Sequence, residues 1–236
     1  MSVILRFDVD RAYPNAVYNH LRVFWNVFPS LDFLGYLDFV KKLLDDLNYR
    51  GIKASFFFRP STLPKEDFAE RILRDRHSVG LHAVRTQSFK DFSGELSKIS
   101  KRFEGKVLGF SKHGSGRRLS RKHEASYNPR KYVQYAKRAN LQYFLGNGED
   151  PSEEETVING VLFFPSAFWL NRNFREDKFT VDWLVEKSTH RDVVLLAHPC
   201  QILLEIERGG LIAREYEEII DRVDDFKTID EIVEGR

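Results

Sequence analysis

The stretch Val3-Ile4-Leu5-Arg6-Phe7-Asp8-Val9-Asp10 stands near the start of the chain and combines an apolar run with two closely spaced aspartates. Residues 3–7 form a mainly apolar run that Asp8 and Asp10 close, which predicts a buried strand ending in a polar loop. Functional groups of parallel α/β folds gather at the carboxyl ends of strands, so both aspartates are candidate site residues. An Asp-x-Asp pair alone is a weak signal, and a capped loop explains it equally well.

Runs typical of strands alternate with runs typical of helices along the rest of the chain. From residue 31 to Gly51, apolar residues recur three and four positions apart, which is the spacing of an amphipathic helix. Residues 11–30 contain Pro14 and Pro29 and are expected to form a long first loop. Further strands are expected at 52–58, 78–82, 106–110, 141–145, 160–164 and 192–197, and further helices at 65–76, 88–103, 129–138, 181–187 and 212–223. Because each crossover helix covers one face of a sheet, this alternation predicts a parallel α/β sheet or barrel.

The composition narrows the class of protein. A chain of 236 residues, 42% hydrophobic and 31% charged, is expected to form one domain over residues 1–236 and is neither disordered nor collagen-like. Its 37 basic and 35 acidic residues nearly balance, so we expect no general affinity for nucleic acid. The sequence has no apolar run long enough to span a membrane, so no membrane span is expected. The first apolar run is already interrupted by the charged residue Arg6, so no signal peptide is expected either. A cytoplasmic location is the resulting expectation, while the oligomeric state is left open.

Histidine and cysteine usage limits the kind of metal site that the chain can build. The chain has one Cys and seven His. One Cys cannot form a thiolate-rich zinc site, so any metal must be held by nitrogen and oxygen ligands. His82 ends a short apolar strand after Gly80, and His198 ends another before Pro199. A set of carboxylates and imidazoles at strand ends can bind Zn²⁺ or a similar divalent ion, with one Asp and one His left for acid–base work.

The order of these motifs resembles the polysaccharide deacetylase family, the carbohydrate esterases with a NodB-like domain. Residues 7–10, with the two aspartates one residue apart, resemble the first motif of the family, and residues 53–58 resemble its second strand. His77-x-x-Gly80-x-His82 is similar to the lead-in of the second motif, and residues 195–199 are similar to the last motif. The resemblance extends from residue 3 to residue 199, which is most of the chain.

The resemblance implies a distorted (β/α) barrel, commonly of seven strands, that removes N- or O-acetyl groups from glycans. It makes Asp8 the catalytic base, Asp10 and His82 metal ligands, and His198 the general acid.

Two departures from the family pattern concern the metal site. The family has a second ligand His four residues after the first, and this chain has Thr86 there. The Arg-x-Pro of the third motif is also absent, and the corresponding stretch is Phe110-Ser111-Lys112-His113-Gly114. His113 follows a predicted strand and is the candidate for the missing ligand; a hydrogen bond to substrate or a plain surface position are the alternatives.

The resulting hypothesis is metal-dependent hydrolysis of an acetyl group, preferably an acetamide, on a sugar. Asp10, His82 and His113 would hold the divalent ion, expected to be Zn²⁺, and Asp8 and His198 would move protons. A basic segment at 98–122 and aromatic residues in the first loop make Lys112, Arg117 and Trp25 candidate contacts to a carbohydrate or to a nucleotide- or lipid-linked sugar.

Two other functions remain open. Thr86 favours a catalytically degenerate, sugar-binding deacetylase fold, whereas the presence of Asp8 and His198 argues against one. A Mg²⁺-dependent phosphatase of the haloacid dehalogenase type also uses Asp-x-Asp after its first strand, but Ala12 and the two strand-end histidines do not fit such a site.

Overall fold

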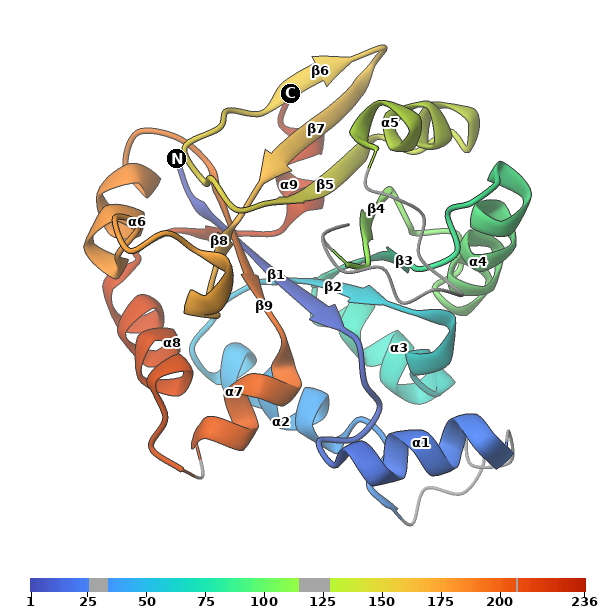
Figure 1. Cartoon of the computed structure of the whole chain (residues 1–236), viewed down its shortest axis with the longest axis horizontal. Coiled ribbons are helices and arrows are strands. Elements are labelled where there is room, and N and C mark those ends of the chain that lie inside the picture. Colours follow the sequence, from blue (N-terminus) through green and yellow to red (C-terminus); the bar gives the residue numbers. More distant parts are fainter. Residues whose placement is uncertain (26–33, 115–127, 207) are drawn as a thin grey trace.

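The computed structural model describes residues 1–25, 34–114, 128–206 and 208–236, and its parallel strands curl around a common interior (Figure 1). Neighbouring strands follow the order β7-β5-β4-β3-β2-β1-β9-β8, and every pair in this series is parallel. The strands of this series are β1 (Val3–Val9), β2 (Ser55–Phe58), β3 (Ser78–Ala83), β4 (Gly109–Lys112), β5 (Tyr143–Gly148), β7 (Val161–Ser166), β8 (Phe168–Trp169) and β9 (Val193–Ala197).

A single bent segment closes the barrel. Only Ala167 separates β7 from β8; β7 pairs with β5 on one side, while β8 pairs with β9 on the other. Treated as one strand, β7 with β8 therefore completes a ring whose seven members also include β1, β2, β3, β4, β5 and β9. The structure confirms the distorted (β/α) barrel that the sequence predicts.

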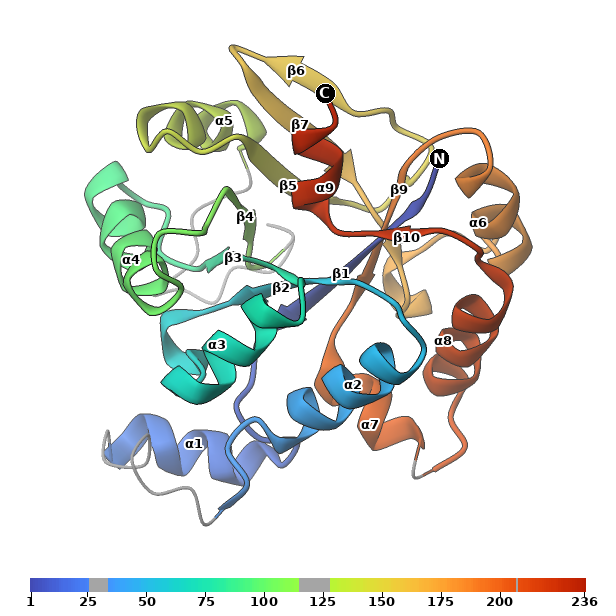
Figure 2. The same cartoon turned by 180° about the vertical axis from the view of Figure 1, so that it is seen from behind.

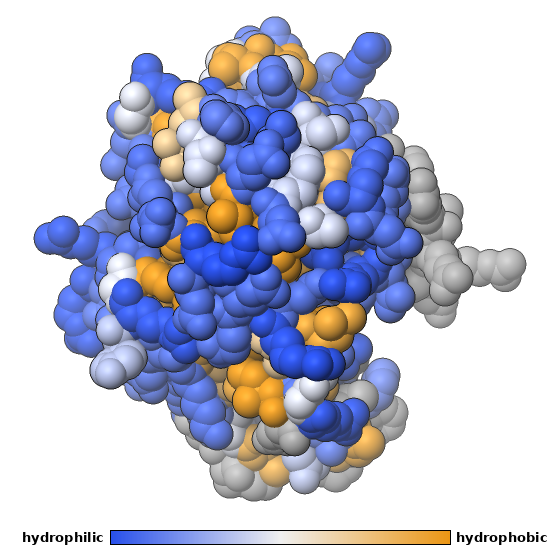
Figure 3. Space-filling model, turned by 90° about the vertical axis from the view of Figure 1, so that its left-hand side faces the viewer, coloured by the Kyte–Doolittle hydropathy of each residue, from blue (hydrophilic) through white to orange (hydrophobic). Residues whose placement is uncertain are grey.

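Helices cover the outside of this ring (Figures 1 and 2). Their apolar sides pack on the sheet, as Leu43, Leu44 and Leu47 of α2 do, and form the larger hydrophobic cluster. The outward face around α6 and α8 is mainly hydrophilic (Figure 3). The covering helices are α2 (Asp38–Tyr49), α3 (Glu66–Arg74), α4 (Phe89–Arg102), α5 (Pro129–Arg138), α6 (Val181–Ser188) and α8 (Leu211–Arg222).

A second cluster of side chains fills the interior of the barrel. Phe57 and Tyr143 pack edge to face there, with ring centroids 6.3 Å apart. Gly80 makes room for them, because a Cβ at this position would overlap the Phe57 ring. Helix α9 (Ile229–Glu234) closes the end of the barrel at which the strands begin. The backbone N–H of Ile229 donates to the Oγ of Ser55, the first residue of β2, over 2.9 Å. Apolar side chains thus fill one end of the barrel and leave its other end for polar groups.

Some elements differ from the sequence prediction. Helix α1 (Ala16–Trp25) occupies part of the expected loop at 11–30, and Asn15 Oδ1 accepts a hydrogen bond from Val17 N–H at its start. Helix α7 (Pro199–Ile206) follows His198 directly, because proline is well suited to the first turn of a helix. The prediction missed β6 (Thr156–Ile158), which is antiparallel to β7, together with β10 (Phe226–Lys227) and α9. No helix in the described ranges is long and apolar enough to cross a membrane.

Candidate metal centre

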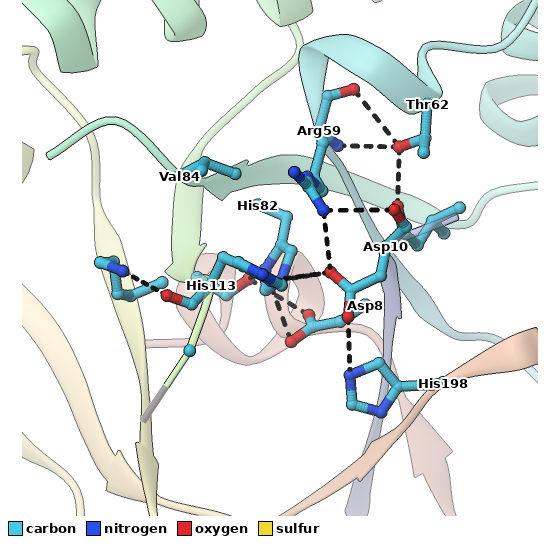
Figure 4. A network of polar contacts seen from close by, with 12 residues as sticks. Asp8, Asp10, Arg59, Thr62, His82, Val84, His113 and His198 are labelled. Carbon is cyan, nitrogen blue, oxygen red and sulfur yellow. Dashed lines mark hydrogen bonds and ion pairs between the residues drawn. The ribbon is translucent and has the colours of Figure 1, made fainter. Parts of the chain in front are cut away.

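Four strand ends bring the predicted site residues together (Figure 4). Asp10 follows β1, His82 lies near the end of β3, His113 follows β4 and His198 follows β9. Parallel strands carry their carboxyl ends to the same rim of a barrel, so residues far apart in the sequence meet there. The three strand ends identified from the sequence therefore form one cluster, which His113 joins.

The donor atoms of Asp10, His82 and His113 form a compact triangle. Asp10 Oδ1 lies 3.0 Å from His82 Nε2 and 2.9 Å from His113 Nδ1, and the two nitrogens are 3.0 Å apart. Ligand atoms bound tetrahedrally to Zn²⁺ at about 2.0–2.2 Å lie about 3.3–3.6 Å from one another, so this triangle is slightly tighter than that of a zinc-bound site. Asp10 Oδ1 is also buried and accepts no hydrogen bond of normal geometry from the described residues. These residues fit a divalent ion. They are the three candidate ligands named from the sequence, and their role as ligands stays a prediction.

The ionisation of the cluster is also suited to cation binding. Burial alone would raise the pKa of Asp10, but the neighbouring imidazoles of His82, His113 and His198 hold it well below its usual value. Burial lowers the pKa of His82, and its interactions with the aspartates only partly oppose this effect. The carboxylate and the neutral imidazole are the forms in which these residues coordinate a metal.

His198 occupies the other side of Asp10. Its Nε2 lies 3.2 Å from Asp10 Oδ2, and its side chain is 16% exposed. Burial would lower the pKa of His198, yet Asp10 and Asp8 raise it above its ordinary value. His198 can therefore carry a proton beside the cluster, as a general acid must.

Asp8 is held by a residue that the sequence interpretation did not identify, Arg6. The Arg6 side chain is fully buried and donates from Nε to Asp8 Oδ1 over 3.0 Å and from Nη2 to Asp8 Oδ2 over 2.6 Å. It also donates over 2.7 Å to the carbonyl of Gly146 and to Asn147 Oδ1. Burial raises the pKa of Asp8, but the charges of Arg6 and His82 lower it overall. One signal was available in the sequence, because residues two apart on a strand share a face and Arg6 is a charged residue in an apolar run.

Asp8 and Ser111 also lie behind His82. His82 Nδ1 is 2.7 Å from Ser111 Oγ and 3.5 Å from Asp8 Oδ2, and Ser111 Oγ donates to Asp8 Oδ1 over 3.2 Å. Such partners orient a ligating imidazole and hold it in one tautomer. In this chain Asp8 is thus positioned to support His82 as well as to accept a proton.

Arg59 is a second residue at the site that the sequence interpretation missed. It follows β2, and its Nη1 lies 4.0 Å from Asp10 Oδ1 and 3.3 Å from the Asp10 carbonyl oxygen (Figure 4). Thr62 fixes the surrounding loop, since its hydroxyl accepts from Arg59 N–H over 3.0 Å and donates to the Val9 carbonyl over 2.7 Å. In the sequence, the position of Arg59 directly after the second strand was the only signal that it could be a site residue.

The remaining predicted residues lie apart from the triangle or outside the described residues. Thr86 is fully buried, with its hydroxyl 3.5 Å from Tyr132 OH. Lys112 ends β4, is buried, and donates from Nζ to the carbonyl of His113. Arg117 lies outside the described residues, and so does the side chain of Trp25 at the end of α1. Substrate contacts by Lys112, Arg117 and Trp25 stay predictions.

Comparison with known proteins rests on structure alone. No protein-family model matches the sequence, and a search of curated proteins finds no relative. A protein from Pseudomonas aeruginosa described as a probable polysaccharide deacetylase superposes with a TM-score of 0.60 at 11% identity, over 98% of this chain and 89% of its own. The catalytic domain of a peptidoglycan N-acetylglucosamine deacetylase from Eubacterium rectale gives 0.51 at 15%, over 96% and 87%.

A CE4-family pseudoenzyme from Bacillus anthracis superposes with a TM-score of 0.52 at 15% identity over 98% of this chain. The chain spans 65% of that protein's length. At these identities the likeness concerns the fold, and function must be argued from the site. The chain therefore has the NodB-like fold of the CE4 polysaccharide deacetylases, in a divergent form.

Proposed function

We propose that the chain is a divergent polysaccharide deacetylase, a metal-dependent hydrolase that removes an acetyl group from the nitrogen of an amino sugar. The observation that carries this proposal is the convergence of Asp10, His82 and His113, with His198 on the opposite oxygen of Asp10. This donor set has two nitrogens and one oxygen, which Zn²⁺ accepts readily. A catalytic zinc site commonly has three protein ligands and an open position.

A bound divalent ion would supply an acidified water and a polarised acetyl carbonyl. Asp8, which Arg6 keeps ionised, takes the proton that the water loses as its oxygen bonds to the carbonyl carbon. His198 donates its proton to the sugar nitrogen as the carbon–nitrogen bond breaks, so that acetate and the amine leave. Asp8 and Ser111 hold the His82 ring throughout.

Measurements of metal content and acetate release test this proposal. The purified protein is analysed for bound divalent metal and assayed on N-acetylated amino sugars, alongside Asp10→Ala, His113→Ala and His190→Ala. His190 is exposed and lies after α6, so its variant is the matched control. We expect Asp10→Ala and His113→Ala to lose both metal and activity and His190→Ala to keep both. Full metal occupancy and rate in His113→Ala would refute the assignment of His113 as a ligand.

A second candidate is sugar binding without catalysis. It is favoured by the engagement of both Asp8 oxygens with Arg6 and by the lowered pKa of Asp8, because both effects weaken this carboxylate as a base. The same engagement opposes the phosphatase alternative, in which Asp8 would be the nucleophile. Metal and sugar binding by a wild-type protein that releases no acetate would select the binding function.

A further inference from the structure

The guanidinium of Arg59 has unused hydrogen-bonding capacity at the edge of the metal centre. Its side chain is 26% exposed, and its Nε is buried without a partner among the described residues. In the described ranges, the guanidinium makes one hydrogen bond and one ion pair, both from Nη1 to Asp10. An arginine fork presents five N–H donors, and a buried donor without a partner is unfavourable. The free side of this fork therefore requires an acceptor that the described residues do not supply.

The charges around the centre also favour an anion. Arg6 neutralises Asp8, which leaves Asp10 as the carboxylate that faces the candidate metal site. A divalent ion on Asp10 would therefore stand beside the Arg59 guanidinium, with the single negative charge of Asp10 to balance both cations. An anionic ligand would remove this excess of positive charge.

We propose that Arg59 binds an anionic oxygen group, a carboxylate or a phosphate, carried by the sugar next to its acetylated nitrogen. Arginine suits this role because its planar fork matches both groups with two parallel hydrogen bonds. The proposal rests on the proposed function for the sugar and goes beyond it by naming the charge of the substrate.

Two other roles for Arg59 predict different behaviour. If Arg59 stabilised the oxyanion of the reaction itself, its loss would slow neutral and anionic substrates equally. If Arg59 only positioned Asp10, its loss would weaken metal binding. Recognition of an anionic substituent instead affects anionic ligands alone.

Binding measurements on the metal-loaded protein separate these roles. Dissociation constants are measured by calorimetry for N-acetylglucosamine, for its 1-phosphate and for N-acetylmuramic acid. The phosphate of the second sugar and the carboxylate of the third are each carried by a ring carbon next to the one that bears the nitrogen. We expect at least one anionic sugar to bind about 10- to 100-fold more tightly than the neutral one, and Arg59→Gln to remove this preference. Phosphate and carboxylate are distinguished by which of the two sugars shows it.

Two further variants serve as controls. Arg85 follows β3 on the same rim, is exposed and pairs with Asp91 at 3.0 Å, so Arg85→Gln removes an equal charge without touching the site and should keep the preference. Arg59→Lys keeps the charge but loses the fork, and we expect it to retain only part of the preference. Affinity for Zn²⁺ alone should be unchanged or higher in Arg59→Gln, because a cation near Asp10 is removed.

Three results would overturn the proposal: no anion preference in the wild type, an equal loss for neutral and anionic sugars in Arg59→Gln, or weaker zinc binding by that variant. The test does not depend on turnover. An Arg59-dependent anion preference without acetate release would support this inference while refuting the hydrolase. Acetate release without an anion preference would support the hydrolase and refute this inference.

Discussion

Arg6 and Asp8 stand two residues apart on β1 and form a bidentate ion pair inside the barrel, with Nε 3.0 Å from Oδ1 and Nη2 2.6 Å from Oδ2. Side chains at alternate positions of a strand point to the same face, so the strand itself sets this pairing. Both side chains are almost completely buried. The pair therefore connects the folding of the barrel with the chemistry at its rim.

Arg6→Met should strongly destabilise the protein, because it leaves the Asp8 carboxylate buried without its partner. We expect a loss of about 3–5 kcal/mol in the free energy of unfolding, measured by chemical denaturation. Arg50→Met is the control: Arg50 pairs with Glu217 and Asp221 on the surface, and its loss should cost at most about 1 kcal/mol. Equal losses in the free energy of unfolding of the two variants would show that the buried ion pair contributes no more to stability than the surface one.

Ser111→Ala should weaken metal binding although Ser111 is not a ligand. It removes the hydroxyl 2.7 Å from His82 Nδ1, which fixes the orientation of this imidazole. Loss of such a partner typically reduces metal affinity about 10- to 100-fold. Competition titration with a chelating dye measures the affinity, and His82→Ala should lose more. An unchanged affinity in Ser111→Ala would mean that Asp8 alone orients the ring.

His198→Gln should lower kcat about 10²- to 10⁴-fold while zinc affinity changes little, since we assign His198 to proton donation. Steady-state kinetics and zinc titration are measured on the same preparation. His20→Gln is the control, because His20 is an exposed residue of α1. A parallel loss of metal and activity would instead make His198 part of the ligand set.

His77 should make stability depend on pH. Its Nδ1 accepts the Ala54 N–H over 3.1 Å, so the proton of the neutral ring is on Nε2, which is 3.1 Å from Asn48 Oδ1. Burial lowers the pKa of His77 to about 4, below the value of 6.5 for an exposed histidine. The unfolded chain then binds the proton first, so stability is complete above about pH 6.5 and falls as the pH drops toward 4, by up to about 3 kcal/mol.

Denaturation of the wild type and of His77→Gln between pH 4 and pH 7 checks this expectation. The slope of stability against pH should become shallower in His77→Gln and should persist in His190→Gln. Equal slopes in His77→Gln and the wild type would assign the effect to other groups.

The parts of the structure that the sequence predicts best are those governed by local patterns. Apolar runs followed by polar residues located β1, β3 and β9, and with them Asp10, His82 and His198. The motif order also led to the correct barrel. These features depend on residues that lie next to one another in the chain.

The features that escaped prediction depend on contacts between distant residues. In the sequence, Arg6 is only a charged residue within an apolar run. Its role could not be predicted, because its acceptors Gly146 and Asn147 come from β5, far away in the chain. Arg59 became notable only when β2 was placed beside β1 and its guanidinium came near Asp10. The arrival of His113 at the triangle likewise required the parallel pairing of β3 with β4, which the sequence could propose but not establish.

The bent segment that closes the barrel has a consequence for motion. Its β8 end joins β9 through two residue pairs, Phe168 with Leu195 and Trp169 with Leu196, whereas β1 joins β9 through five. Short ladders open more readily than long ones, so the amide of Leu170, which bonds to the Leu196 carbonyl over 2.9 Å, should exchange with solvent faster than those of the β1–β9 ladder. Trp169 lies beside His198, with ring centroids 6.2 Å apart. The wall of the barrel beside the proposed acid is therefore where we expect the ring of strands to open first.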